Sequence, residues 1–321
     1  MKKLIMLTSA IALAGTMSFA RENVQVTGSS TVLPYATIVA EAFGENFDFA
    51  TPVVEGGGSG AGRKRLCEGV GPNTVDIANS SSKMKEEEWT ACEAAIGEVT
   101  EVRIGYDGIV FASNIGSLNI KDLTPAQLYS ALHADSTATL WSDVDPALPA
   151  IEILALIPGT KHGTREVFDV KVMEAGCKAV KGVDKLSKEE IAECVKVRTD
   201  GRSVDIDGDY TETLARLDAN QTALGVFGLS FYQNNMSKLE VTTVNGVFPT
   251  VDAIATGEYP ISRPLYFYVK NAHLDVIPGL REYIEFFVSD EMAGPNGPLA
   301  EYGLVSDPEL AETQELVKNI K

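Results

Sequence analysis

Positive charge is scarce in this sequence. Its 321 residues include 27 Lys and Arg against 45 Asp and Glu, which gives a net charge of −18. A surface of that sign repels nucleic acid and anionic membranes, so we expect no nucleic-acid partner. The balance of 45% hydrophobic and 22% charged residues excludes disordered, collagen-like and coiled-coil chains. At this length the prediction is two domains with sizeable cores.

Metal-ligand spacing is also missing. The three histidines are far apart in sequence, and the four cysteines form no C-x2-C pair. Metal ligation remains the alternative, but we predict no metal site and no cofactor. An even number of cysteines in an exported chain favours disulfides instead. Pairing of sequence neighbours would join Cys67 to Cys92 and Cys177 to Cys194, each bond contributing about 3 kcal/mol.

Long apolar runs are absent after the first 20 residues. Lys2 and Lys3 precede a short apolar stretch, Leu4–Leu13, and Ser18-Phe19-Ala20 has the small-x-small pattern of a cleavage site. These features predict a cleaved secretory signal peptide over residues 1–20. The alternative is a membrane anchor, for which the apolar run is too short. The mature chain is therefore expected in the periplasm.

A pattern of strand, small polar loop and helix occurs three times before residue 100. The predicted strands are Val24–Thr27, Phe49–Val54 and Val75–Ala78. This alternation predicts an α/β fold with a mostly parallel sheet, whose ligands sit beyond the carboxyl ends of the strands.

The rest of the chain continues with mixed elements. Strands are predicted at Ile104–Ala112 (broken at Asp107-Gly108), Ile151–Ile157, Leu224–Phe227 and Leu265–Val269. Helices are predicted at Leu123–Leu132, with Thr124 and Pro125 as N-cap and first residue, at Leu280–Ser289 and from Glu309. Lys181–Ser203 is predicted as a surface excursion held by the second disulfide, and Ser237–Pro249 has no clear pattern.

Four segments share one design, in which small residues with free N–H and hydroxyl groups precede a helix. They are Gly28–Val32, Gly56–Gly62, Asn79–Ser82 and His162–Arg165. Helix N-termini carry partial positive charge and unpaired N–H donors, so converging ends would bind an anion. Arg165 would add a bidentate guanidinium. The alternative is that each segment is only an N-cap or a turn.

Enzyme motifs fit these residues less well. Arg63 stands where the Walker A pattern requires Lys, so that phosphate-binding loop is excluded. Gly57-x-Ser59-x-Ala61 is close to a nucleophile elbow, but it needs a later Asp and His. We therefore predict a protein that is not an enzyme, and a secreted phosphate-ester hydrolase remains the alternative.

Taken in order, these motifs resemble those of the phosphate-binding protein of the high-affinity (Pst-type) phosphate ABC transporter. The matching pieces span nearly the whole mature chain: Thr27–Pro34, Gly57–Gly60, Asp76–Ser81, Tyr106–Ile109, Gly163–Phe168 and Tyr259–Leu265.

The resemblance implies a periplasmic-binding-protein type II fold, with two α/β lobes, a hinge and a ligand cleft between the lobes. Lobe I would combine residues 21–105 with 263–321, and lobe II would be residues 106–262. The ligand would be inorganic phosphate, captured for import, and the partners would be inner-membrane permease subunits. The protein would be a monomer. Receptors for phosphite, arsenate, sulfate or molybdate are the alternatives of the same class.

The resemblance also implies the binding residues. Lobe I would supply Ser30, Thr31, the Val32 backbone, Ser59 and Ser81, and lobe II would supply Gly163, Thr164 and Arg165. His162 stands where many members of the family have Ser, and Pro158-Gly159 stands where an Arg is common. Arg165 and Lys161 are the candidates for the missing charge.

Asp107 is the candidate acceptor in the site. A carboxylate there would accept a hydrogen bond from a P–OH group and repel sulfate, which carries no proton at neutral pH. The alternatives are that Asp107 is a general base or that it only caps a turn. His162 has an ordinary pKa near 6.5 and would tie affinity to pH, unless only its backbone N–H takes part.

Overall fold

The computed structural model describes residues 21–160, 163–207 and 210–321. The predicted signal peptide, Lys161 and His162 lie outside these ranges. Within them, no helix is long and apolar enough to cross a membrane.

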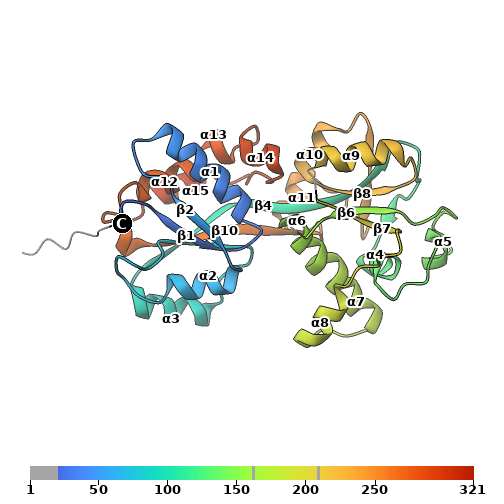
Figure 1. Ribbon diagram of the computed structural model, residues 1–321, viewed down its shortest axis with the longest axis horizontal. Helices are drawn as coiled ribbons and strands as arrows, with labels where there is room; N and C mark the ends of the chain where they lie inside the picture. Colours follow the sequence, from blue (N-terminus) through green and yellow to red (C-terminus); the bar gives the residue numbers. More distant parts are fainter. Residues whose placement is uncertain (1–20, 161–162, 208–209) are drawn as a thin grey trace, which may run out of the picture.

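In the described part of the chain, ten strands form one mixed sheet that runs the length of the molecule (Figure 1). The strand order is β2-β1-β3-β10-β4-β8-β6-β7, and β9 pairs with both β4 and β5. The strands are β1 (Gln25–Gly28), β2 (Val53–Gly56), β3 (Ile77–Ser80), β4 (Val99–Asn114), β5 (Asp122–Leu123), β6 (Ala155–Pro158), β7 (Ser203–Ile206), β8 (Leu224–Gly228), β9 (Leu239–Val244) and β10 (Ser262–Lys270).

Helices cover both ends of this sheet. The first end carries α1 (Leu33–Asn46), α2 (Ser59–Leu66), α3 (Glu86–Ile96), α12 (Leu280–Phe287), α13 (Asp290–Ala293), α14 (Pro298–Tyr302) and α15 (Leu310–Lys318). The other end carries α4 (Pro125–Leu132), α5 (Trp141–Val144), α6 (Gly163–Val167), the π-helix η1 (Phe168–Glu174), α7 (Ala175–Lys181), α8 (Lys188–Cys194), α9 (Tyr210–Ala219), α10 (Leu229–Asn234) and α11 (Val251–Ala255). A 3₁₀ turn, η2 (Asn271–His273), follows β10.

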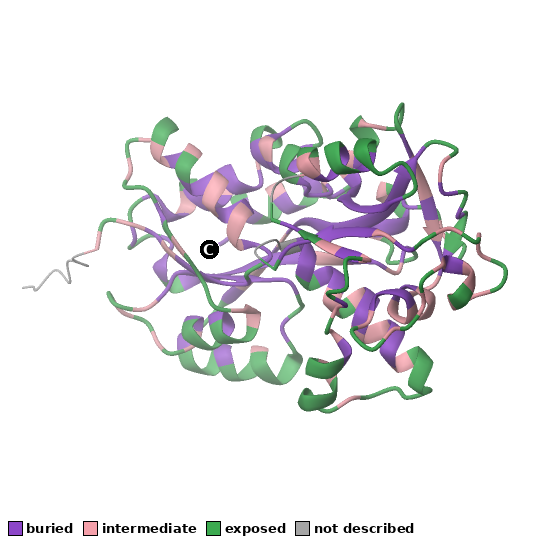
Figure 2. Ribbon diagram, turned by 45° about the vertical axis from the view of Figure 1, so that its right-hand side comes forward, coloured by how far each residue is buried: buried purple, intermediate pink, exposed green. Residues whose placement is uncertain are grey.

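Two large hydrophobic cores lie on the two halves of the sheet. One contains buried residues between Tyr106 and Ile261, together with Val305. The other contains residues from both ends of the chain, from Val24 to Ile104 and from Leu265 to Ile320. Figure 2 shows the strands as the buried layer, with the exposed faces of the helices outside. The molecule therefore consists of two α/β lobes.

Two strands connect the lobes. β4 pairs with β10 from Val99 to Gly108 and then with β8 and β9 up to Asn114. The predicted break at Asp107-Gly108 is therefore wrong. Gly108 does not make a turn; it leaves space, because a Cβ there would lie 2.5 Å from Ile254 Cδ1.

The sheet is less parallel than predicted. β1, β2 and β3 are parallel to one another, as are β6, β7 and β8. β4 and β10 are antiparallel to each other and to their outer neighbours β8 and β3. The reason is topological, since one strand carries the chain into the second lobe and the other carries it back.

The predicted cap of α4 and the two predicted disulfides are confirmed. Thr124 caps α4 through the Gln127 N–H at 3.1 Å, and Pro125 begins the helix. Both predicted disulfides form, with Cα–Cα distances of 4.8 Å for Cys67–Cys92 and 5.8 Å for Cys177–Cys194. Sequence patterns missed α8, inside the predicted surface excursion, and β9, inside the segment without a clear pattern.

Candidate functional site

The loops after β1, β2 and β3 meet at the carboxyl edge of the first half of the sheet. The Ser29 N–H donates to the Asn79 carbonyl at 2.9 Å, and the Gly58 N–H donates to the Gly28 carbonyl at 2.8 Å. Only glycine fits at two of these positions. A Cβ on Gly28, where φ is +137°, would lie 2.1 Å from the Asn79 carbonyl oxygen, and one on Gly62 would lie 2.4 Å from Gly28 Cα.

The loop before α1 holds the first group of predicted residues. Ser29 Oγ accepts from the Thr31 N–H at 3.2 Å and from the Val32 N–H at 3.4 Å. Thr31 and Val32 are fully buried, whereas Ser30 is exposed. The fold thus fixes the start of α1 through the Ser29 hydroxyl, a residue that sequence reasoning did not single out.

Ser59 and Ser81 form a second group, at the start of α2 and after β3. Ser59 Oγ lies 3.1 Å from Ser81 Oγ and also accepts from the Ser81 N–H at 3.1 Å. Arg63 lies beside them, because its Nη1 donates to Ser80 Oγ at 2.7 Å and its guanidinium is 3.2 Å from the Glu88 carboxylate. The structure therefore brings the two predicted hydroxyls together.

The third group joins the two lobes. The Thr31 hydroxyl donates to the Glu166 carboxylate, although 135 residues separate the two. Arg263 Nη2 donates to Thr31 Oγ1 at 2.8 Å and lies 3.3 Å from Glu166 Oε2. Sequence reasoning assigned no role to Glu166 or Arg263. Both residues lie inside matching motifs, Glu166 in Gly163–Phe168 and Arg263 in Tyr259–Leu265. This position was the signal that could have identified them.

Asp107 lies next to this group. In the β4–β10 ladder it is the register partner of Arg263. It is 1% exposed, and neither carboxylate oxygen has a hydrogen-bond partner among the residues that the structure describes. Burial raises the pKa of Asp107 to about 6; the Arg263 charge lowers it and the Glu166 charge raises it. A buried acceptor of this kind is suited to a ligand that brings its own proton.

Thr164 and Arg165 lie on α6, which starts at Gly163. Thr164 is 9% exposed and hydrogen-bonds with the Tyr210 side chain, whose pKa burial raises above its ordinary range. The Arg165 guanidinium donates to Asp169 at 2.8 Å, to Asp205 at 2.9 Å and to the Pro158 carbonyl at 3.1 Å. Tyr210 is a neighbour of the site that sequence reasoning missed.

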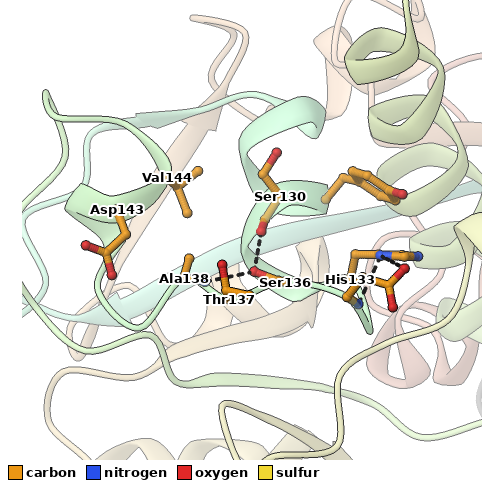
Figure 3. Close-up of a pocket in the computed structure, with 9 residues that line it drawn as sticks. Ser130, His133, Ser136, Thr137, Ala138, Asp143 and Val144 are labelled. Atoms are coloured by element: carbon orange, nitrogen blue, oxygen red, sulfur yellow. Dashed lines mark hydrogen bonds and ion pairs between the residues drawn. The ribbon is translucent and has the colours of Figure 1, made fainter.

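A separate hollow of about 510 Å³ lies on the other half of the molecule, around α4 and α5 (Figure 3). Its polar side chains are bonded locally. Ser136 Oγ donates to the Ser130 carbonyl at 2.6 Å, and His133 Nδ1 accepts from the Asp135 N–H at 3.2 Å. In the described ranges, no cluster of three or more His, Cys, Asp or Glu side chains could hold a metal ion.

Comparison with known proteins identifies the family. Residues 15–291 match the model of the PBP superfamily domain, and the chain belongs to this superfamily. The chain is 29% identical over 300 residues to the phosphate-binding protein PstS of Staphylococcus haemolyticus, covering 92% of this chain and 84% of that protein. It is also 28% identical over 287 residues to the protein SphX of Synechocystis, covering 87% and 78% of the two chains.

Solved structures agree on the fold. A possible phosphate binding protein from Planctomyces limnophilus is 26% identical with a TM-score of 0.72, covering 92% of this chain and 96% of that one. An ABC-type phosphate transport receptor from Vibrio cholerae is 21% identical with a TM-score of 0.59, covering 88% and 99%. The predicted periplasmic-binding-protein fold is therefore confirmed.

Proposed function

We propose that this chain is an extracytoplasmic substrate-binding protein that captures inorganic phosphate for an ABC importer. The observation that carries the proposal is Asp107, a buried carboxylate that lies opposite Arg263 in the β4–β10 ladder and has no hydrogen-bond partner among the described residues. The relatives named as phosphate-binding proteins support the same ligand. The chain would work in the periplasm as a monomer without a cofactor, after removal of residues 1–20, and would deliver phosphate to permease subunits.

The proposed lobes are residues 21–105 plus 263–321 and residues 106–262. The separation of the two hydrophobic cores supports this division, because the core residues of the second lobe run from Tyr106 to Ile261 with Val305 added. The proposed binding residues are Ser30, Thr31, Val32, Ser59, Ser81, Asp107, His162, Gly163, Thr164 and Arg165.

Phosphate binding needs a donor for almost every oxygen, since removing the anion from water is costly. Hydroxyls such as that of Ser59, with backbone N–H groups at helix starts, would supply these donors, since the Thr31 hydroxyl already donates to Glu166. Asp107 would accept the hydrogen bond of the P–OH group. Sulfate has no proton to offer there, so its oxygens would face an ionised carboxylate and binding would be weak.

Closure of the lobes would complete the cage. The Thr31–Glu166 hydrogen bond joins residues of the two proposed lobes, so it would form only when the lobes approach each other. Contacts that exist only in the closed state are the means by which a closed form is favoured.

Isothermal titration of the mature protein, stripped of ligand by partial unfolding, tests the proposal. We expect phosphate to bind at micromolar concentration or below and sulfate to produce no heat. Arsenate, phosphite and molybdate are titrated next, because they define the alternative oxyanion receptors. Turnover of a phosphate monoester would instead indicate the hydrolase. Absence of phosphate binding would refute the proposed function.

A further inference from the structure

Arg165 and Lys161 are the cations that the sequence predicts for this site. Lys161 lies outside the described residues, and two carboxylates pair with Arg165. Its Nε donates to Asp169 and its Nη1 donates to Asp205, at 2.8 and 2.9 Å. Its Nη1 also donates to the Pro158 carbonyl at the end of β6. These contacts fasten α6 to β6 and leave little of the Arg165 charge for a ligand.

Arg263 is placed differently. Leu265, Phe267 and Val269 alternate along β10 and face the core under α1. Arg263 has the same parity, so its side chain leaves the sheet on the same face, beyond the start of α1. There it donates to Thr31, one of the proposed phosphate-binding residues.

The guanidinium of Arg263 is buried but incompletely bonded. Its side chain is 10% exposed. Nη2 donates to Thr31 Oγ1, Nη1 reaches Glu166 Oε1 at 3.4 Å, and Nε is buried with no partner among the described residues. A buried N–H group without a partner is costly unless a ligand accepts its hydrogen bond. The carboxylate of Glu166, whose side chain is 45% exposed, pairs with the Arg263 guanidinium and orients it.

We propose that Arg263 supplies the main positive charge that binds the anion at this site, with its Nε–H donated to the ligand, and that Arg165, which also fixes the position of α6, contributes less. This inference rests on the proposed function, because it takes phosphate as the ligand. It adds a binding residue from a strand that joins the lobes, which places the charge beside Asp107 and Thr31 at once. Arg263 thereby lies opposite the predicted acceptor Asp107 and donates to the Thr31 hydroxyl.

Titration of two variants with inorganic phosphate tests this role. Arg263→Gln should weaken phosphate binding by about 10- to 100-fold, the range for a lost charge-assisted hydrogen bond. Arg263→Lys should recover part of the affinity, because lysine restores the positive charge but not the planar guanidinium with its several N–H donors. Arg281→Gln is the matched control, since Arg281 is in the same proposed lobe and pairs with Asp275 at the surface. Its phosphate affinity should equal that of the wild-type protein.

A spectroscopic measurement separates binding from folding. In protein labelled with ¹⁵N-arginine, the Nε–H resonance that disappears in Arg263→Lys should shift when phosphate is added, and that of Arg281 should not. If wild-type protein binds no phosphate, the proposed function and this inference both fail. If wild-type protein binds phosphate but folded Arg263→Gln binds within threefold of it, or the Arg263 resonance does not move, this inference alone is overturned. Should Arg263→Gln fail to fold, the Lys variant and the resonance shift decide.

Discussion

Asp107 and Arg263 are register partners in the β4–β10 ladder, at the point where the sheet passes from one core to the other. Their opposite charges lie on neighbouring strands, yet both carboxylate oxygens of Asp107 lack a hydrogen-bond partner in the described part of the chain. An acceptor and a donor are thus held side by side in a buried place. Such a pair is suited to an anion that carries both a charge and a proton.

The selectivity prediction follows from the acceptor. Asp107→Asn should let sulfate bind, because the amide can donate to an oxygen that the carboxylate repels. We expect the sulfate affinity to rise to within about tenfold of the phosphate affinity, since one buried unpaired acceptor accounts for discrimination of about 10⁴ or more. Calorimetric titration with both anions measures the ratio. A variant that still rejects sulfate would show that Asp107 is not the discriminating group.

The same residue predicts a pH-dependent stability of the ligand-free protein. The pKa of Asp107 is about 6 in the fold against 3.8 for an exposed aspartate, so the fold favours the protonated carboxyl. The free energy of unfolding therefore falls as the pH rises from about 4 to about 6. Above pH 6 the cost of burying the ionised carboxylate is present in full and no longer changes with pH. Asp107→Asn should raise the free energy of unfolding at pH 8 by up to about 3 kcal/mol, and by almost nothing at pH 3.5.

Denaturant unfolding of the variant across this pH range measures the effect. Asp218→Asn, at an exposed position of α9, is the control and should leave the pH profile unchanged. Equal stability of Asp107→Asn and wild-type protein at pH 8 would contradict the prediction.

Release of the ligand should depend on Glu166. Glu166→Gln weakens the hydrogen bond from Thr31 and removes the ion pair with Arg263, which join the proposed lobes. We expect phosphate to dissociate about 3- to 10-fold faster, because a hydrogen bond between the lobes contributes about 1 kcal/mol. Stopped-flow measurement of the dissociation rate tests this, with Glu193→Gln, a surface partner of Lys196, as the control. An unchanged or slower release would mean that Glu166 does not hold the lobes together.

Two glycines of α2 should respond in opposite ways to the same substitution. Gly62→Ala places a Cβ 2.4 Å from Gly28 Cα, so it should push α2 away from β1 and cost more than about 2 kcal/mol. Gly60→Ala meets no atom within 4 Å and should be neutral or slightly stabilising, because Ala favours helix over Gly. Thermal unfolding of both variants checks the contrast, and equal melting temperatures would contradict it.

The two disulfides should contribute almost equally to stability. They close loops of 25 and 17 residues, and the entropy of loop closure changes slowly with loop length. Replacing either pair by Ser should cost about 3 kcal/mol, with a difference of well under 1 kcal/mol between them. Chemical unfolding of Cys67→Ser/Cys92→Ser and Cys177→Ser/Cys194→Ser measures both values. A pair that can be removed without cost would refute the entropic account for that loop.

Sequence patterns predicted the parts of the fold that local chemistry decides. The cap and first residue of α4, at Thr124 and Pro125, follow from hydrogen bonding and from the fixed φ of proline. The three repeats of strand, small loop and helix predicted β1 to β3 and α1 to α3. The break expected at Gly108 was wrong because a glycine there satisfies packing against Ile254, which a sequence pattern cannot show.

The contacts of the candidate site depend on residues far apart in the chain. Thr31 meets Glu166 across 135 positions and Arg263 across 232. Sequence patterns identified Thr31 by its place before a helix, but no local signal links it to a strand near the other end. The pairing of Arg165 with Asp205 could not be predicted from local sequence either, since the two residues are 40 positions apart. The roles of the individual binding residues remain predictions.

The two cores differ in how the chain assembles them. One draws its residues almost entirely from a continuous stretch, whereas the other needs residues from both ends of the chain. The chain is synthesised from its N-terminus. The core built mainly from residues 106–261 can therefore form before β10 and the C-terminal helices exist, whereas β1 to β3 need those later elements to complete their core. The core that draws on both ends of the chain is therefore complete only after β10 and the C-terminal helices have been synthesised, whereas the core of residues 106–261 lacks only Val305 before that point. A protein shortened at its C-terminus should keep one compact half and leave the other unfolded.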